Sequence, residues 1–443
     1  MKFYDREREI AALRLIRERS HEAAKFTVVT GRRRVGKTQL LKHAMEDEPY
    51  LYFYVSRKSE KDLCEGFQNE IARVLGLTMV GEAQRFEVLF KAVMEEAKRR
   101  PVTLIIDEFQ EFFRINPSVF SAMADIWDDA QKTAKINLIV CGSVNRMINR
   151  IFKDRSEPLY GRNTGNLHVD PFTVTVLKQI LGDHFAGYTN EDLLALWTMT
   201  GGVARYVEQL MDDHAYTKKK MLNAVFQRDS PYLEEGVSIL VQEFGKEYGT
   251  YFSIMSAIAS GRTEYSQIKN EVGCEVGAFL AKLEDDYGLV KRKVPIFAAK
   301  SSKHSVYEID DCFFRFWFRF IWKNQYLKEL QRFDTMRELA ERDYAVFSGY
   351  ALERYFRWKF IEERRYTRLD AWGDRKGENE IDFVGEDELA NKLDFCEVKR
   401  EAARIDLEKL KVKSAAFFAK NPQLQARENR IPGFPCQICR VVL

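Results

Sequence analysis

Short apolar runs alternate with amphipathic segments over the first part of the chain. The runs have the length and β-branched content of buried strands and cover residues 26–29, 50–55, 102–106 and 136–141. Apolar residues recur at helical spacing in the intervening stretches 63–75, 86–100 and 117–132. Regular alternation of strands and helices predicts an α/β fold, with a parallel sheet covered by helices.

The pattern turns helical from residue 169 and changes again near residue 236. Three short amphipathic helices are predicted there, and Tyr251, Ile254 and Ile258 lie on the apolar face of the first. The segments 289–294 and 306–309 then read as a hairpin. Three helices followed by a hairpin predict a winged-helix domain.

The charges of this region leave its partner open. Basic residues that fit contacts with DNA phosphates lie in and near the hairpin, at Lys291, Arg292, Lys293, Lys300 and Lys303. The third helix instead carries acids, at Glu275, Glu284, Asp285 and Asp286. The alternatives are therefore a DNA-binding wing, a protein-binding module and a spacer between domains.

The segment 312–322 holds many aromatic residues and two arginines. Aromatic side chains interleaved with arginine are also found on surfaces that stack nucleic-acid bases. A buried helix that joins domains is the favoured interpretation, with only the arginines reaching water.

The residues 30–38 fit the phosphate-loop pattern G-x-x-x-x-G-K-[ST], between an apolar strand and a helix. Glycines allow the loop backbone to turn its N–H groups toward an anion, and the helix adds its positive dipole end. Lys37 is expected to reach the β- and γ-phosphates of ATP, and the Thr38 hydroxyl to bind Mg²⁺. The predicted nucleotide-binding residues are Gly31, Arg32, Arg33, Arg34, Val35, Gly36, Lys37, Thr38 and Gln39.

The apolar run 102–106 ends in two acids, Asp107 and Glu108. Ligands of parallel sheets bind at the carboxyl ends of the strands, where these acids fall. Asp107 is predicted to hold Mg²⁺, and Glu108 to orient or deprotonate the attacking water.

Three further residues are candidates near the nucleotide. Ser143 follows the next strand and could sense the γ-phosphate, although a simple strand-to-helix turn explains it equally well. Arg162 could reach the transferred phosphoryl group, and a surface salt bridge is the slightly favoured alternative. Arg205 follows a glycine pair and could contact nucleotide from the helical segment.

The C-terminal hundred residues contain a second set of acids with a lysine. Asp382 lies in one predicted strand, and Glu397 and Lys399 lie two apart in the next, so that they share a face. Glu353 lies near the start of a preceding predicted helix. Metal-dependent phosphodiester cleavage uses such residues: Glu353, Asp382 and Glu397 as metal ligands, and Lys399 to position or deprotonate water. A solvated acidic hairpin is the alternative.

Composition limits the classes of partner and the cellular compartment that we expect. The chain has 443 residues, a hydrophobic fraction of 45% and a net charge of +3, which is too mild to demonstrate a nucleic-acid partner. We expect no membrane span and no signal peptide, because no apolar run is long enough and the N-terminus is highly charged. Seven scattered cysteines indicate reduced thiols in the cytoplasm. The only C-x-x-C, at Cys436 and Cys439, reads as part of a terminal strand rather than a zinc site.

Two resemblances add to these patterns. The chain resembles the archaeal/bacterial ATPase family, on the AAA+/STAND side of the P-loop proteins. The residues that carry this resemblance are 5–7, the phosphate loop, 104–108, 141–143, 159–162, 201–206 and the aromatic run 312–322. The family usually has proline where this chain has Ala204. Residues 371–375, with Asp382, Glu397 and Lys399, resemble the PD-(D/E)xK nuclease superfamily, in a version attached to this ATPase family as a domain of unknown function.

The resemblances imply the whole arrangement. We predict a P-loop ATPase core at 1–168, a helical lid at 169–235, a winged helix at 236–310, aromatic-rich linker helices at 311–345, and a nuclease-like domain at 346–443. The expected activity is hydrolysis of ATP with Mg²⁺, coupled to DNA binding or cleavage. Two alternatives stay open: a regulator that binds DNA without cutting it, and a STAND-like switch that forms a homo-oligomer on binding ATP.

Overall fold

The computed structural model describes residues 1–142, 145–294, 296–297, 305–374, 379–401, 404–425 and 428–430. It divides into two compact units. The first unit comprises Lys2–Pro171 with Val203–Arg205, and the second comprises Met1, Phe172–Gly202 and Tyr206–Leu443.

A parallel sheet forms the centre of the first unit, with the strand order β2-β3-β4-β1-β5. Its strands are β1 (Lys25–Gly31), β2 (Leu51–Tyr54), β3 (Val102–Asp107), β4 (Ile136–Cys141) and β5 (Gly165–Val169). All six residues of β3 and all six of β4 are buried, as expected for strands in the middle of a covered sheet. The predicted parallel α/β sheet is thereby confirmed.

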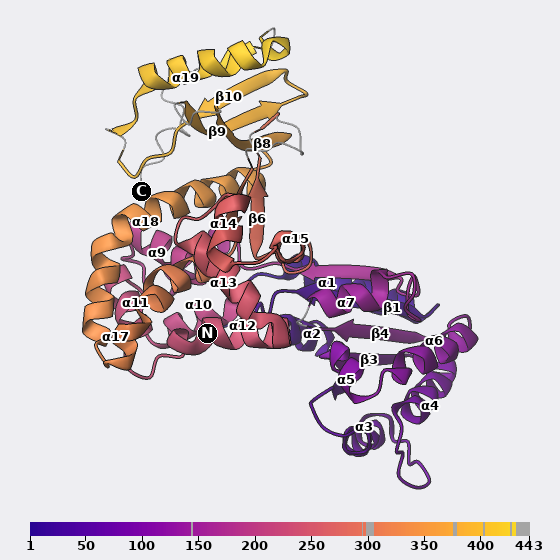
Figure 1. Ribbon diagram of the computed structural model, residues 1–443. Coiled ribbons are helices and arrows are strands. Elements are labelled where there is room, and N and C mark those ends of the chain that lie inside the picture. Colours follow the sequence, from indigo (N-terminus) through magenta and orange to yellow (C-terminus); the bar gives the residue numbers. More distant parts are fainter. Residues whose placement is uncertain are drawn as a thin grey trace. The chain divides into compact units, whose positions relative to one another are not determined.

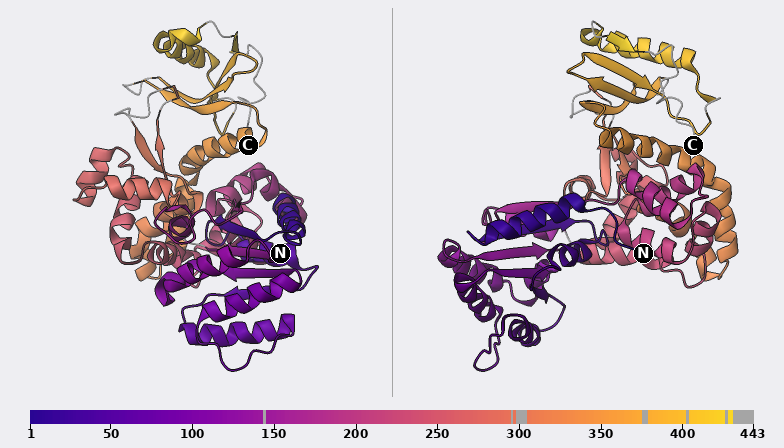
Figure 2. Two further views of the ribbon diagram at one scale, coloured as in Figure 1. Left: turned by 90° about the vertical axis from the view of Figure 1, so that its right-hand side faces the viewer. Right: turned by 180° about the vertical axis from the view of Figure 1, so that it is seen from behind.

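Helices cover both faces of this sheet (Figure 1 and Figure 2). They are α1 (Glu7–Ser20), α2 (Lys37–Met45), α3 (Glu60–Leu75), α4 (Phe86–Arg99), α5 (Phe112–Ile115), α6 (Ser118–Ala130) and α7 (Asn145–Lys153). Helices α1 and α2 share one apolar cluster with the sheet, which includes Leu13, Leu40 and Ile139. Helices α3, α4, α6 and α7 form a larger cluster on the opposite face, around Phe26 and Trp127.

Strand β5 was not among the predicted strands. It pairs with β1 from Thr27↔Gly165 to Gly31↔Val169, and within it only Val169 is fully buried. Because β5 is an edge strand with one face toward solvent, its apolar content is low and the sequence pattern is weak.

Helices make up the start of the second unit. They are α8 (Val174–His184), α9 (Asn190–Thr200), α10 (Ala204–Asp212), α11 (Lys218–Val225) and α12 (Tyr232–Phe244). A Cβ atom on Gly202 would lie 2.2 Å from the carbonyl oxygen of Phe172, and Gly202 has a φ of +75°. The glycine pair thus permits a close approach of two backbone segments at this point.

Three helices and a hairpin follow in the predicted order. They are α13 (Tyr248–Ala259), α14 (Tyr265–Val272), α15 (Gly277–Asp285), β6 (Val290–Lys293) and β7 (Val306–Ile309). Strands β6 and β7 are antiparallel, and Glu264, just before α14, forms an isolated antiparallel bridge with Val306. Lys300 and Lys303, two of the predicted phosphate contacts, lie outside the described residues.

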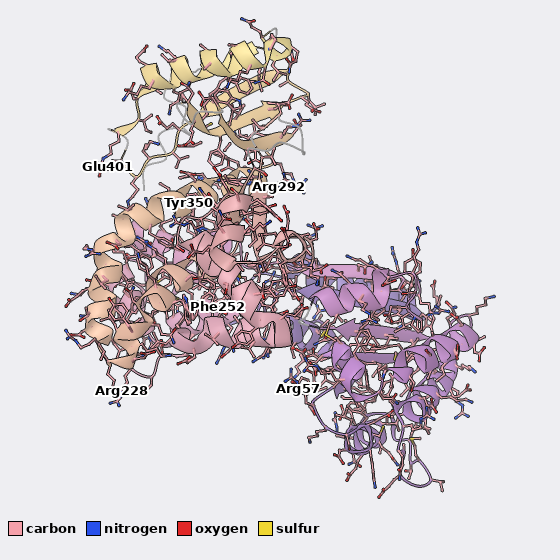
Figure 3. The ribbon with its side chains drawn as sticks, in the orientation of Figure 1. Arg57, Arg228, Phe252, Arg292, Tyr350 and Glu401 are labelled. Atoms are coloured by element: carbon pink, nitrogen blue, oxygen red, sulfur yellow. The ribbon has the colours of Figure 1, made fainter. Side chains whose placement is uncertain are left out.

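The aromatic run is buried, as favoured from the sequence. It forms α16 (Cys312–Phe316), η3 (Trp317–Ile321) and η4 (Trp322–Asn324), followed by α17 (Gln325–Glu329). Phe252 of α13, labelled in Figure 3, packs edge-on against Trp322 with ring centroids 4.3 Å apart. Phe313, Phe314 and Trp317 are at most 1% exposed, so they are not surfaces for stacked bases.

The next helix departs from the prediction. Helix α18 (Phe333–Glu362) is continuous for 30 residues and passes through the predicted boundary between 345 and 346. Glu353 therefore lies in the last third of a long helix rather than near the start of one. The buried residues Met336, Ala340, Tyr344 and Ser348 continue the helical spacing up to Gly349, which is tolerated inside the helix.

The last described residues form a four-stranded sheet, with the order β11-β10-β9-β8. Its elements are β8 (Arg368–Gly373), β9 (Glu380–Asp387), β10 (Lys392–Cys396), α19 (Leu407–Lys420) and β11 (Glu428–Arg430). Strands β8, β9 and β10 are antiparallel neighbours, whereas β11 runs parallel to β10. Leu410 and Phe417 of α19 share an apolar cluster with Trp372 and Phe395 of the sheet.

Two smaller expectations concern the whole chain. Within the described ranges, the search for a helix long and apolar enough to cross a membrane finds none. The five described cysteines are all free thiols: Cys64, Cys141, Cys274, Cys312 and Cys396. Cys436 and Cys439 lie outside the described residues.

Candidate functional sites

The loop between β1 and α2 has the conformation that its glycines predict. Gly31 and Gly36 have φ values of +147° and +98°, and Arg34 has a φ of 66°. A Cβ atom on Gly31 would lie 2.5 Å from the carbonyl oxygen of Val169 in β5, so a larger residue would displace that strand. The loop therefore requires glycine both for its turn and for its packing.

Lys37 is the first residue of α2 and is 7% exposed. Its Nζ donates to the carbonyl oxygens of Gly31 at 2.8 Å and Arg32 at 3.0 Å. The ammonium group thus lies over the loop whose amides would hold a phosphate, where the N-terminus of α2 also favours negative charge.

Asp107 collects hydrogen bonds from residues on three neighbouring elements. Its Oδ2 accepts from the hydroxyls of Thr38 and Tyr52, each at 2.7 Å. Its Oδ1 accepts from the Cys141 thiol at 2.7 Å and the Glu108 amide at 2.9 Å. The side chain of Asp107 is thereby fixed at the carboxyl end of β3.

This oxygen set fits a magnesium ion. Because the Thr38 hydroxyl donates a hydrogen bond to Asp107, the lone pairs of the Thr38 oxygen point elsewhere and can bind a cation. Hydroxyl and carboxylate oxygens are the ligands that Mg²⁺ prefers in proteins. Thr38 and Asp107 are therefore the residues that would hold the metal of a metal–nucleotide complex.

Glu108 adopts a left-handed backbone conformation, with a φ of 55°. Its side chain is half-buried, and its Oε2 accepts a hydrogen bond from the amide of Gln110. Gln110 is itself fully buried. This orienting residue was not predicted, and its signal in the sequence is a polar residue two positions after Glu108.

Arg6 is a second residue at the site that was not predicted from the sequence. It is 5% exposed, and its Nη2 donates to the carbonyl oxygens of Val35 at 3.4 Å and Asp170 at 2.6 Å. A buried arginine thus joins the phosphate loop to the segment that follows β5. Its place in the run Asp5-Arg6-Glu7 was the available signal.

The remaining predicted nucleotide contacts lie in different surroundings. The Arg205 amide donates to the carbonyl oxygen of Arg34 at 3.2 Å, so its backbone lies at the loop, and its side chain is exposed. Gln39 is exposed on α2. Arg162 forms an ion pair of 2.6 Å with Asp128 of α6, which is the salt bridge expected as the alternative. Ser143 lies outside the described residues.

Asp382, Glu397 and Lys399 converge in the C-terminal sheet. The Lys399 Nζ lies 3.4 Å from Asp382 Oδ2 and 3.3 Å from Glu397 Oε1, between the two carboxylates. These two acids raise the pKa of Lys399 above its usual value against the opposing effect of burial, so the side chain stays charged. Glu397 is 8% exposed, and its Oε2 is buried with no hydrogen-bond partner among the residues that the structure describes.

Glu397 and Lys399 do not lie in the strand that was predicted to hold them. Strand β10 ends at Cys396, so Glu397 and Lys399 follow the strand and do not share one of its faces. The Asp382 carboxylate accepts the Val398 amide at 2.7 Å, which takes that amide out of the sheet ladder. Arg400 then anchors the segment through hydrogen bonds to Ser348 of α18 and Glu191 of α9.

Glu353 faces the same region from α18. Burial, and secondly the charge of Asp382, raise the pKa of Glu353 to about 7. Lys293 of β6 and Lys399 oppose this rise. Within the described part of the chain, however, no three His, Cys, Asp or Glu side chains form a ready cation cluster, so the predicted Glu353, Asp382 and Glu397 ligand set is not assembled as one group.

A second lysine completes this site. The Lys413 Nζ of α19 lies 3.4 Å from the same oxygen of Glu397 that Lys399 contacts. Lys413 lies on the helix between the buried residues Leu410 and Phe417, at the spacing of the apolar face. A lysine at an apolar position was therefore the sequence signal for this residue, and it was missed.

Comparison with known proteins relates the first part of the chain to a family of ATPase domains. Residues 3–210 match a family model described as an ATPase domain predominantly from Archaea. An uncharacterised protein of Methanocaldococcus jannaschii is 28% identical over 407 residues, which cover 90% of this chain and 87% of that protein.

Two solved structures share the fold. The Walker-type ATPase of Pyrococcus abyssi has a TM-score of 0.53 and 18% identity, over 72% of this chain and 96% of that chain. The ORC2 protein of Aeropyrum pernix, in complexes with ADPNP and ADP, has a TM-score of 0.52 and 13% identity, over 77% and 96%. Residues 3–210 thus match an ATPase domain found predominantly in Archaea, and the chain shares the fold of P-loop ATPases.

Proposed function

We propose that the first unit binds ATP with Mg²⁺ and hydrolyses it. The observation that carries this proposal is the hydrogen bond of 2.7 Å between Thr38 and Asp107, beside the buried Lys37 at the glycine-bearing loop. A phosphate cradle and a metal-binding acid are thus held together at one edge of the sheet. The family match over residues 3–210 supports the same activity.

Each residue has a role that follows from its position. Lys37 neutralises charge on the phosphates, and the loop amides bind their oxygens. Glu108, held by Gln110, accepts the proton of the attacking water. A bound Mg²⁺ would stabilise the negative charge that develops on the transferred phosphoryl group. Ser143, Arg162 and Arg205 remain proposed contacts of the nucleotide.

Calorimetry and a phosphate-release assay test this proposal. We expect the purified chain to bind ATP with Mg²⁺ and to release phosphate. Lys37→Ala should lose both, whereas Lys61→Ala, on α3, should retain them because Lys61 is exposed and its ion pair with Glu82 lies on the surface. Folded wild-type protein that takes up no MgATP would contradict the proposal.

A second candidate function concerns nucleic acid at the C-terminal site. We propose that Asp382 and Glu397 hold a divalent metal there, with the buried, unpartnered Oε2 of Glu397 as one ligand. The order α18, β8, β9, β10, α19, β11, with the acid-x-Lys segment directly after the third strand, supports the PD-(D/E)xK interpretation. The three helices and hairpin of α13–β7 support a winged helix that accompanies it.

Incubation with plasmid DNA, Mn²⁺ and ATP tests this second function. Cleavage that is lost in Lys399→Ala supports an ATP-gated DNA-processing enzyme. If wild type cuts nothing but shifts DNA in a gel differently with and without ATP, the chain is a regulator. If only light scattering changes on ATP addition, and not in Lys37→Ala, the chain is a STAND-like switch that forms a homo-oligomer.

A further inference from the structure

The hydroxyl of Tyr52 is the part of the ATP site that the roles above leave unexplained. Tyr52 lies in β2, the strand next to β3, and its hydroxyl donates to Asp107 Oδ2 at 2.7 Å. Thr38 donates to that same oxygen at the same distance. A side chain from a neighbouring strand therefore shares Asp107 Oδ2 with Thr38, the residue that would bind the metal.

The ring of Tyr52 is held by the same helix that carries Thr38. The Nζ of Lys42 lies 4.6 Å from the centre of the Tyr52 ring, and Lys42 follows Thr38 by one turn of α2. Tyr52 also packs against the apolar cluster between α2 and the sheet. The phenol thus touches α2 through its ring and β3 through its hydroxyl.

The direction of the hydrogen bond follows from chemistry. Asp107 is a carboxylate that has only acceptor oxygens, so the phenol must donate. A phenol keeps its proton at physiological pH, because its ordinary pKa is about 10. Tyr52 is therefore a constant donor to Asp107.

We propose that Tyr52 is a positioning residue, which holds Asp107 Oδ2 in the orientation needed to bind the magnesium of a nucleotide complex. The inference rests on the proposed ATP function and assigns to it a residue from β2. Hydrogen-bond partners of metal ligands fix the direction of the ligand lone pairs, and their loss lowers metal affinity by about ten- to a hundredfold. In this proposal Tyr52 orients Asp107, and Thr38 binds the metal through the lone pairs of its hydroxyl oxygen.

A purely structural role for Tyr52 makes a different prediction. If the phenol served only to fill space between α2 and the sheet, removal of its oxygen would leave the ring contacts intact. Nucleotide binding would then be unchanged, or would weaken equally with and without metal. The positioning role predicts a loss that appears only when metal is present.

Calorimetric titration with ADP, once with Mg²⁺ and once with EDTA, separates the two. For Tyr52→Phe we expect the affinity for ADP in EDTA to equal that of wild type. The factor by which Mg²⁺ increases the affinity for ADP should be about tenfold smaller than in wild type. Tyr50→Phe is the matched control, because Tyr50 packs against the same apolar cluster and the substitution likewise removes one phenol oxygen. A Mn²⁺ titration followed by electron paramagnetic resonance should show the same loss in Tyr52→Phe alone.

The outcomes are distinct. Wild-type protein that gains affinity from Mg²⁺, with Tyr52→Phe gaining just as much, overturns the positioning role and leaves the ATP function standing. An equal loss with Mg²⁺ and with EDTA also overturns it. Wild-type protein that binds no ADP under either condition overturns the ATP function and the inference together.

Discussion

The Nζ of Lys413 lies 3.4 Å from Glu397 Oε1, and the Nζ of Lys399 lies 3.3 Å from the same oxygen. Two ammonium groups from different elements therefore share one buried carboxylate oxygen. Because Glu397 is 8% exposed, its charge needs such partners. Lys413 thus belongs to the C-terminal site, although it lies in α19, beyond the acid-x-Lys segment.

Replacement of Lys413 should impair the C-terminal site in a charge-dependent way. On the proposed nuclease function, we expect Lys413→Met to lower Mn²⁺-dependent DNA cleavage by about tenfold or more, because a positive charge beside Glu397, where the phosphate would react, is lost. Lys413→Arg should retain most of the activity. Lys409→Met is the control, since Lys409 is 77% exposed and pairs only with Asp406 among the described ion pairs. Equal rates for Lys413→Met and the control would show that Lys413 has no part in cleavage.

Glu353 should make stability depend on pH. Its pKa is raised to about 7 in the folded protein, from a usual value of 4.5, first by burial and then by Asp382. The folded state therefore holds this proton to higher pH than the unfolded state. The cost of ionising Glu353 is absent below about pH 4.5, grows as the pH rises to about 7, and is constant above, at no more than about 3 kcal/mol.

Glu353→Gln should remove this cost. We expect the variant to have a higher thermal midpoint than wild type at pH 8, with little difference at pH 5. Glu388→Gln serves as the control, because Glu388 is 55% exposed and its ion pair with Arg368 is on the surface. If Glu353→Gln raised the thermal midpoint equally at pH 5 and pH 8, the gain would not come from the ionisation of Glu353.

Glu108→Gln should separate binding of ATP from its hydrolysis. The amide keeps the size of the side chain but cannot accept a proton from water, so the rate of phosphate release should fall by about a hundredfold or more. MgATP affinity should stay within a few-fold of wild type. Gln110→Leu should lower the rate less, since it removes only the donor that orients Glu108. A rate for Glu108→Gln close to that of wild type would exclude Glu108 as the base.

The features that the sequence predicted well are those specified within a short stretch of chain. The loop that holds Lys37 needs glycine at Gly31 and Gly36, and the buried strand ahead of Asp107 needs a run of apolar residues. Both requirements are local, and so is the spacing that placed the helices of the first unit. Local patterns therefore gave the position of the phosphate cradle and of the acid beside it.

The features that it missed depend on contacts between distant residues. Tyr52 read as an ordinary strand residue, because its role arises only when β2 lies beside β3. Lys399 was placed on a strand face, but the side chain of Asp382 takes the Val398 amide and ends β10 early. The start of α18 was also missed, although buried residues at helical spacing, from Met336 to Ser348, precede Gly349.

Arg6 provides the last prediction, which is the counterpart of the one for Tyr52. Its guanidinium is 5% exposed and donates to the carbonyl oxygens of Val35 and Asp170. Arg6→Ala leaves both oxygens without this charged donor, which costs about 1–3 kcal/mol for hydrogen bonds of this kind. Because Val35 belongs to the phosphate loop itself, we expect ADP affinity to fall by roughly tenfold.

The metal dependence distinguishes Arg6 from Tyr52. Since Arg6 supports the loop and not the metal ligands, its loss should weaken ADP binding equally with Mg²⁺ and with EDTA, in the same calorimetric titration. Arg8→Ala is the matched control, because Arg8 is exposed on α1. A lower thermal midpoint for Arg6→Ala with undiminished ADP affinity would mean that the arginine supports only the fold. An effect restricted to Mg²⁺ would instead place Arg6 with Asp107 and Thr38, against the contacts that it makes in the structure.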